Sequence, residues 1–189
     1  MQKQIFFSFV LVMMLVGKVK AQHNNPFGNA LIPDMIADAS IQEINGVFYC
    51  YATTDGYGQG LKTSGPPVVW KSKDFVHWSF DGTYFPSAAK EKYWAPSKAI
   101  FANGKYYIYP TINGYMYPAV ADKPEGPFKI DHIQKTLPIQ NDVTGDQTLF
   151  QDDDGKAYII CSSANGRAYQ YVIPLRESDF LDIDEENIK

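Results

Sequence analysis

One ten-residue pattern, INGVFYCYAT at residues 44–53, decides the fold of this chain. The pattern returns twice with the same layout, as ANGKYYIYPT at 102–111 and as DDGKAYIICS at 153–162. Each copy has a turn that ends in glycine, followed by a run of aromatic and aliphatic residues. The copies recur at intervals of about 50 to 60 residues, and such a period is typical of an array built from one supersecondary unit.

The repeated unit consists of short strands and turns. Each copy opens on a dipeptide that is favoured in hairpin turns because it tolerates positive φ. These dipeptides are Asn45-Gly46, Asn103-Gly104 and Asp154-Gly155. The runs that follow are apolar on both faces, which is typical of strands buried between stacked sheets. The segments between the copies, VVWKSKDFVHWSF at 68–80 and GYMYPAVADKPEGPFKI at 114–130, read as further strand pairs.

Four short strands in a unit of about 50 residues predict one blade of a β-propeller. A β-sandwich with coincidentally similar strands is the alternative, but it leaves the repeated spacing of turn and strand unexplained. A closed propeller has roughly four to eight blades, and residues 22–189 hold about three repeats. We therefore expect an all-β domain over 22–189 that forms part of a propeller and belongs to a longer protein.

The N-terminus reads as a targeting segment. Lys3 precedes the apolar run IFFSFVLVMMLVG at 5–17, and the segment ends at Ala21 with a small-residue cleavage pattern. This arrangement predicts a secretory signal peptide over residues 1–21. A membrane anchor is the alternative, but the run is short for a span. We expect export, a secreted or periplasmic protein, and no membrane span after cleavage.

Composition narrows the classes of partner. The net charge is −4, and aromatic residues make up 15% of the chain. Nucleic-acid binding would favour a basic face, so it is not expected here.

Export permits a disulfide, but Cys50 and Cys161 take similar positions in two different repeats, and we expect two buried core thiols. The sequence leaves the oligomeric state open.

Candidate site residues precede the repeated strands. A propeller brings the start of each blade to a central pocket, where the equivalent positions read Asp38, Ser97 and Asp146. Two carboxylates in a sugar-sized pocket can serve glycosidic hydrolysis, in which a base activates water and an acid protonates the leaving oxygen. The alternative is a backbone-capping role for Asp38 and an Asx-turn for Asp146. Trp94 either stacks on a sugar ring or packs in the core.

Five segments together resemble glycoside hydrolase family 43, five-bladed β-propeller enzymes that act on arabinose- and xylose-containing plant polysaccharides. They are ADASIQEINGVFYCYAT at 37–53, VVWKSKDFVHWSF at 68–80, YWAPSKAIFANGKYYIYPT at 93–111, AVADKPEGPFK at 119–129 and GDQTLFQDDDGKAYI at 145–159. The resemblance extends over residues 25–175, and it lies in the order and spacing of the segments rather than in any single motif.

The resemblance implies a role for each candidate. Asp38 would be the general base, and Asp146 would orient the general acid and modulate its pKa. Ser97, where many members carry Asp after Trp-Ala-Pro, would bind substrate. Members of the family usually have the tripeptide Asp-Pro-Ser at the first site, whereas this chain has Ala39 in place of the proline.

The general acid of the family is a Glu on a later blade, and no Glu before Lys189 lies in a matching motif. We therefore expect two of three catalytic carboxylates in this chain, which would be inactive alone. The implied reaction is inverting release of α-L-arabinofuranosyl or β-D-xylosyl residues from a plant polysaccharide or oligosaccharide. A propeller that binds glycans without cutting them is the alternative, and an interaction scaffold is a more distant one.

The implied reaction needs no cofactor, because water is the nucleophile. Some relatives hold a structural calcium in the propeller channel, and nothing in this sequence tests for one. Asp152, Asp153 and Asp154 lack the ligand spacing of an EF-hand and read as a hairpin tip. The three histidines show no metal-ligand spacing either, so no metal site is assigned.

Overall fold

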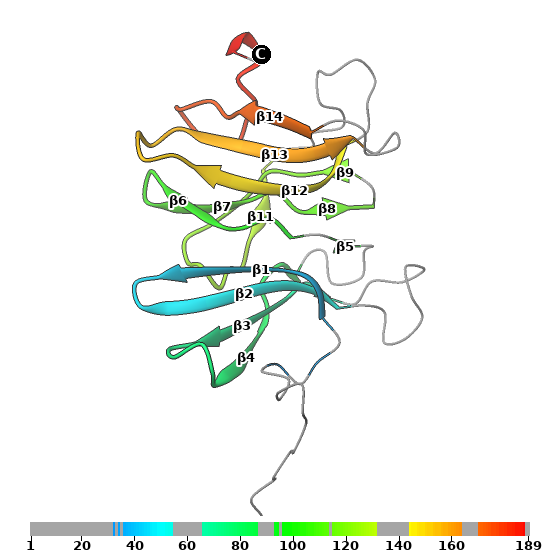
Figure 1. Cartoon of the computed structure of the whole chain (residues 1–189), viewed down its shortest axis with the longest axis vertical. Coiled ribbons are helices and arrows are strands. Elements are labelled where there is room, and N and C mark those ends of the chain that lie inside the picture. Colours follow the sequence, from blue (N-terminus) through cyan, green and yellow to red (C-terminus); the bar gives the residue numbers. More distant parts are fainter. Residues whose placement is uncertain are drawn as a thin grey trace, which may run out of the picture. The chain divides into compact units, whose positions relative to one another are not determined.

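The first repeat folds into a four-stranded antiparallel sheet, here called blade 1, with its strands in chain order. The strands are β1 (Ile36–Ile44), β2 (Val47–Thr54), β3 (Val68–Ser72) and β4 (Trp78–Thr83) (Figure 1). This computed structural model describes residues 32, 34, 36–54, 66–86, 93–94, 96–113, 115–131, 144–163 and 170–187. These residues belong to one compact unit, Leu31–Lys189. The predicted signal peptide lies outside the described residues.

The second repeat forms blade 2, a four-stranded sheet in the order β11-β10-β7-β6. Its strands are β6 (Ile100–Ala102), β7 (Lys105–Ile108), β10 (Ala119–Ala121) and β11 (Lys129–Ile130). A small second sheet was not predicted; one of its strands precedes β6 in the chain, and the other two lie between β7 and β10. It consists of β5 (Tyr93–Trp94), β8 (Thr111–Ile112) and β9 (Tyr115–Met116), in the order β5-β8-β9.

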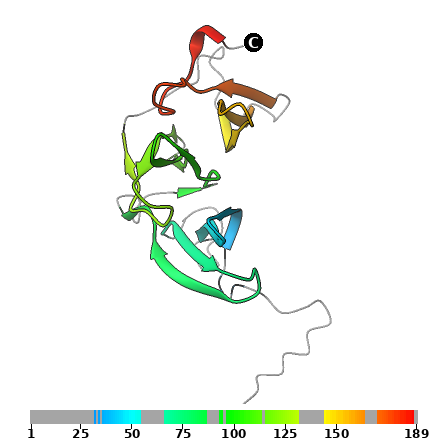
Figure 2. The same ribbon diagram turned by 90° about the vertical axis from the view of Figure 1, so that its left-hand side faces the viewer.

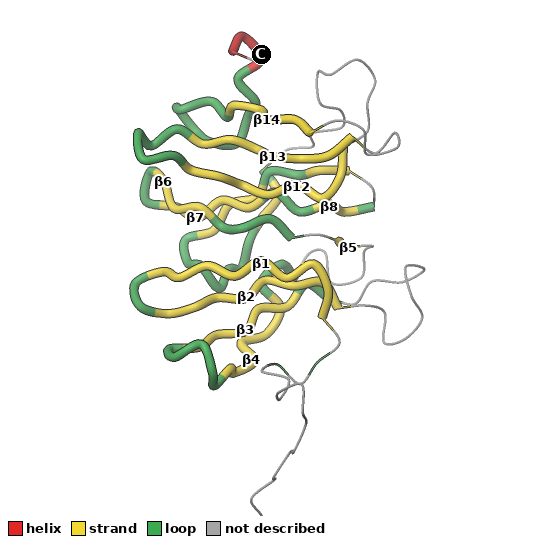
Figure 3. Tube along the Cα trace, in the orientation of Figure 1, coloured by secondary structure: helices red, strands yellow, loops and turns green. Residues whose placement is uncertain are grey.

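The third repeat forms blade 3, with three described strands in the order β12-β13-β14. They are β12 (Thr144–Gln151), β13 (Ala157–Ser163) and β14 (Gln170–Pro174). Figure 2 shows the three blades following one another in the order of the sequence. Strands dominate the described trace in Figure 3, and its helical segment is the short 3₁₀ turn Glu185–Asn187. The all-β prediction with about three blades is confirmed.

Two of the three repeated turns are tight hairpins of two residues. Asn45 and Asn103 adopt left-handed φ angles of 52° and 49°, and each is followed by a glycine with φ near 75°. Positive φ at both central residues is the mark of the turn type that matches strand twist. The third turn is different, because Gln151 pairs with Ala157 and leaves residues 152–156 as a longer loop. There the described left-handed residue is Gly155 alone.

The aromatic strand β7 is buried on both faces because it lies between two cores. In β7, Tyr106 and Ile108 join a core that is shared with blade 1, whereas Tyr107 belongs to a core that is shared with blade 3. Full burial of one such side chain contributes on the order of 1.5 to 3 kcal/mol. The run KYYIY thus meets the requirement of a middle blade, which has to pack against a neighbour on each side.

Both cysteines are free and buried, as predicted. Burial raises the pKa of the Cys50 thiol to about 11, so this thiol is protonated and unreactive at neutral pH. Their positions in the repeat nevertheless differ. Cys50 pairs with Ile41 in the regular part of blade 1, whereas Cys161 lies opposite an interruption of the β12–β13 pairing. The residue that takes that place in blade 1 is Ala52.

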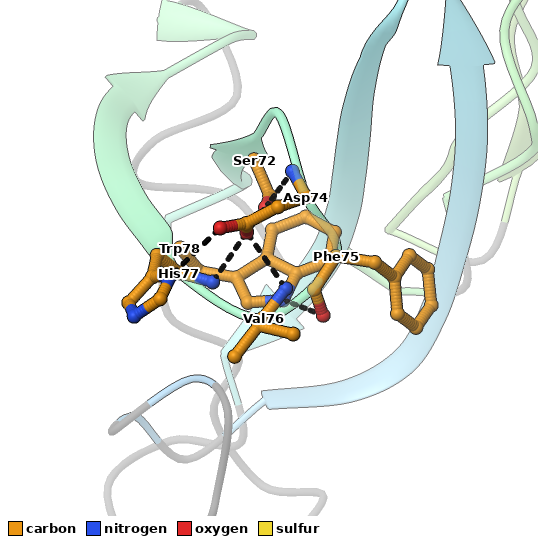
Figure 4. Close-up of polar contacts among 6 residues, drawn as sticks. All are labelled: Ser72, Asp74, Phe75, Val76, His77 and Trp78. Carbon is orange, nitrogen blue, oxygen red and sulfur yellow. Dashed lines mark hydrogen bonds and ion pairs between the residues drawn. The ribbon is translucent and has the colours of Figure 1, made fainter.

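The connection between β3 and β4 is organised by the carboxylate of Asp74 (Figure 4). Its Oδ1 accepts hydrogen bonds from the Ser72 hydroxyl and from the backbone N–H groups of Val76 and His77, the last at 2.8 Å. Its Oδ2 lies 2.7 Å from His77 Nδ1. The imidazole and backbone donors of His77, followed by the other donors, hold the pKa of Asp74 well below its usual range. His77 lies on the surface, and sequence reasoning missed its contact with Asp74.

Replacing Asp74 with Ala is therefore expected to lower the thermal midpoint at neutral pH. The folded state depresses the pKa of Asp74, so its contribution is present above the unfolded-state pKa of about 4 and is lost as pH falls through the folded-state value. The gap between wild type and variant should shrink in strong acid. Thermal melts from pH 7 to pH 2 check this, with Asp122→Ala as control, since Asp122 has an exposed ion pair with Lys105. Equal effects of the two substitutions at pH 7 would contradict the prediction.

Among the residues that the structure describes, none belongs to a helix long and apolar enough to cross a membrane.

Candidate active site

Two β-bulges lie at the same place in blades 1 and 3. In blade 1, Ala37 pairs with Thr53 and Ser40 pairs with Tyr51, so Asp38 and Ala39 together face one residue of β2. In blade 3, the pairing of β12 with β13 slips in the same way between Gly145 and Thr148, around Asp146 and Gln147. A bulge bends its strand and redirects a side chain, and bulges are frequent beside active sites. The repeat therefore presents one aspartate from each bulge.

The bulges hold both aspartates in an unusual backbone conformation. Asp38 has a φ of 49° and Asp146 a φ of 52°, in the left-handed region. Residues other than glycine are uncommon there, although Asp and Asn enter it more readily than most. Backbone strain of this kind tends to collect at functional positions. The shared angle and the shared bulge indicate that the two residues are structural equivalents.

The two bulges line one pocket of about 260 Å³. Its walls are Asp38, Ala39 and Ser40 of β1, Asp146, Gln147 and Thr148 of β12, and Pro96 of blade 2. Both aspartates are exposed, so the carboxylates meet solvent in the pocket. Among these lining residues there are two acids and no basic side chain. Such a pocket disfavours an anionic ligand and raises the pKa of any further carboxyl group placed in it.

A network of buried polar groups joins the pocket wall of blade 3 to blade 2. Gln147 is only 3% exposed. Its Nε2 donates to the backbone carbonyl of Tyr109 at 2.6 Å, and its Oε1 accepts from the Thr111 hydroxyl at 2.8 Å. On the other side, the backbone N–H of Tyr109 donates to the Ser97 hydroxyl oxygen at 2.6 Å. The network thus fixes the bulge of β12 against residues 109–111, where β8 begins.

Asp38 and Asp146, the predicted general base and modulator, are brought together in this pocket, while their catalytic roles stay predictions. Ser97 was aligned with them, but the strand pairing corrects that alignment by one residue. Ile100 pairs with Tyr107 in blade 2 as Gln42 pairs with Tyr49 in blade 1. Counting back from this register makes Pro96 the counterpart of Asp38.

The other two candidates have different outcomes. Ser97 is fully buried and holds the Tyr109 backbone, and it is absent from the pocket lining. The backbone of Trp94 pairs with Thr111 in the small second sheet, and its side chain is outside what the structure describes. Substrate binding by Ser97 and Trp94 stays a prediction.

Sequence reasoning missed Gln147, although a signal was present. Residues of β12 alternate between exposed and buried from Asp146 to Phe150. Gln147 and Leu149 take the two buried positions, so a polar side chain stands where the pattern calls for an apolar one. A buried amide must find hydrogen-bond partners. The buried amide in an apolar pattern therefore indicates that a neighbouring element supplies hydrogen-bond partners for Gln147.

The described fold is bladed and all-β, and the first strands of two blades present aspartates to one pocket. Paired carboxylates are the groups with which glycosidases work. Residues 27–186 match the family model for glycosyl hydrolases family 43. The chain belongs to this family.

Named relatives agree with this assignment. The chain is 27% identical over 157 residues to a β-xylosidase of Xylanibacter ruminicola, with 73% of this chain and 48% of that protein aligned. It is 29% identical over 143 residues to xylosidase/arabinosidase 43A of Humicola insolens, covering 65% of this chain and 42% of that protein. A solved structure of a glycoside hydrolase is similar with 69% identity and a TM-score of 0.72, covering 86% of this chain and 38% of the other. The chain thus spans about half, or less, of the length of these proteins.

Proposed function

We propose that the protein containing this chain is an inverting glycoside hydrolase. It releases terminal β-D-xylosyl or α-L-arabinofuranosyl residues from plant polysaccharides or oligosaccharides. The observation that carries the proposal is the pair of equivalent bulges that present Asp38 and Asp146 to one pocket. The names of the two curated relatives, a xylosidase and a xylosidase/arabinosidase, support the pentose substrate.

In this proposal the water-facing carboxylate of Asp38 is the general base. It takes a proton from the water that attacks the anomeric carbon. Inversion requires the acid on the opposite side of the sugar, at roughly 6.5 to 9.5 Å from the base, to leave room for that water. The acid is a third carboxyl group, supplied by residues other than the 189 of this chain, and it protonates the leaving oxygen. No redox cofactor enters this reaction, because water is the nucleophile.

The role of Asp146 is to keep that acid protonated. An ionised neighbour disfavours a second negative charge, so Asp146 raises the pKa of the acid towards neutrality. The pocket contributes to this effect, since its lining holds two acids and no basic side chain to offset them.

Replacing Asp146 with Asn should move the pH profile of hydrolysis. Without the negative charge the pKa of the acid falls, and the acid loses its proton at lower pH. The alkaline limb of kcat/KM is therefore expected to shift to lower pH by on the order of one unit. Rates of aryl-xyloside hydrolysis from pH 4 to pH 9 would test this. An unchanged alkaline limb would remove Asp146 from the role of modulator.

For the chain alone we propose binding without hydrolysis. Titration of the 189-residue chain with xylobiose and with an arabinofuranosyl-xylobiose, followed by NMR, tests sugar recognition. Shifts confined to residues 38–40 and 146–148 would support a sugar site, and their absence would count against the proposal. Hydrolysis by the chain alone would contradict the proposal that the general acid is not among its 189 residues.

A non-catalytic glycan-binding propeller is the second candidate, because the same pocket would hold a sugar without cutting it. The two candidates separate in a polypeptide that carries these residues within a complete family domain, since only the enzyme releases pentose. Export to the periplasm or the medium also belongs to the proposal, on the strength of the N-terminal sequence, and fits a polymeric substrate outside the cell.

A further inference from the structure

The side chain of Gln147 is buried, and both its amide nitrogen and its amide oxygen form hydrogen bonds. Its two polar atoms make bonds of opposite sense, one donated to the Tyr109 carbonyl and one accepted from the Thr111 hydroxyl. A carbonyl oxygen can only accept, so the amide nitrogen must face Tyr109 and the orientation of the group is settled by its partners. A buried amide with both ends satisfied is a directional link, here between two blades.

This link lies where the backbone ladder is interrupted. Between Gly145 and Thr148 the pairing of β12 with β13 slips, leaving Asp146 and Gln147 opposite a single residue. The ladder therefore fixes this stretch less well than the rest of the strand. The Gln147 side chain supplies an anchor next to Asp146, and the anchor point itself is held by Ser97 through the Tyr109 N–H.

Blade 1 offers a comparison within the same molecule. The residue equivalent to Gln147 there is Ala39, which has no side-chain hydrogen-bonding group. The bulge of Asp38 is therefore set without an amide link of this kind. The two aspartates share a backbone conformation but differ in their support, so the link belongs to Asp146 specifically.

We propose that Gln147 is a positioning residue that fixes the Asp146 carboxylate in the pocket through its hydrogen bonds to Tyr109 and Thr111. Its functional meaning rests on the modulator role proposed for Asp146. By the same network, Ser97 acts as a support of the Tyr109 backbone. Gln147 contacts no reacting atom in this account and acts through its neighbour.

The test uses the carboxyl-carbon NMR signals of Asp38 and Asp146 in the 189-residue chain, recorded at one neutral pH. Gln147→Leu removes both hydrogen bonds at similar volume and is expected to displace the Asp146 signal while leaving Asp38 in place. Thr111→Val removes one bond and should give a smaller displacement of the same sign. Gln151→Leu is the matched control, because Gln151 lies on the same strand and bonds to Gly155 in an exposed hairpin.

The readout needs no hydrolysis, so it can fail or succeed independently of the proposed enzyme function. Thermal melts show whether each variant folds. If Gln147→Leu does not fold, the Asp146 signal of Thr111→Val decides whether the proposal stands. An Asp146 signal that coincides with wild type in the variants that fold would overturn the proposal. Equal displacement of Asp38 and Asp146 would also overturn it, because it would show a general loss of packing.

Discussion

Asp38→Asn is expected to reduce pentoside hydrolysis by about 10³-fold while leaving the fold unchanged. General base catalysis contributes roughly 10²- to 10⁴-fold, and an amide cannot take the proton from water. Asn also enters the left-handed region readily, so it can keep the φ of 49° that Asp38 adopts. The substitution therefore removes the base without adding backbone strain. The measurement is kcat/KM on aryl β-D-xyloside and aryl α-L-arabinofuranoside, with the enzyme present as a complete family domain.

The matched control for this substitution is Asp81→Asn. Asp81 lies in β4, outside the pocket, and forms an ion pair with Lys71 at 2.9 Å. Its loss should leave kcat/KM near the wild-type value. Sugar binding by Asp38→Asn should persist, because the pocket keeps its other walls. An Asp38→Asn enzyme with more than about a tenth of wild-type activity would be hard to reconcile with a general base.

Gly126→Ala is expected to give a large loss of stability, on the order of 3 kcal/mol. A Cβ atom at Gly126 would lie 2.4 Å from the Tyr84 carbonyl oxygen and 2.9 Å from the Phe128 nitrogen. These two atoms form a hydrogen bond of 2.8 Å between the end of blade 1 and blade 2. Both obstacles are backbone atoms, so relief requires the blades to shift. Chemical denaturation of the chain measures the effect.

Gly104→Ala separates the clash from the backbone strain. Gly104 has φ of +74°, close to the +85° of Gly126, but a Cβ there would meet nothing within 4 Å. It should cost about 1 to 2 kcal/mol for the left-handed conformation alone. The excess for Gly126→Ala then reports the steric contact between the blades. Similar losses for the two variants would show that the contact at Gly126 relaxes freely.

The fold was predictable because its signal is repeated. Three copies of a turn and an aromatic strand give the blade, and the double-sided apolar run of β7 indicates a strand with a core on each face. The small second sheet was not predicted, since β5, β8 and β9 are two residues each. Strands so short carry too few residues for an alternating pattern to be recognised.

The site was predictable only in part. Asp38 and Asp146 could be aligned from the turns that follow them, and the structure places both on one pocket. Ser97 was misaligned by one position, because it is the polar residue nearest to the expected place, whereas the spacing of Asp38 from its glycine turn points to Pro96 in blade 2. Gln147 was missed because its partners, Tyr109 and Thr111, lie on another blade. Contacts between blades depend on packing, which local sequence patterns do not encode.

The most direct test of the account is the configuration of the first sugar released. Aryl β-D-xyloside would be hydrolysed by the complete family domain that contains this chain, and the product would be followed by NMR before mutarotation. We expect α-D-xylose to appear first, because Asp38 delivers water to the face opposite the leaving group. First appearance of β-D-xylose would contradict it, since retention requires a carboxylate nucleophile at shorter range in place of a base that activates water.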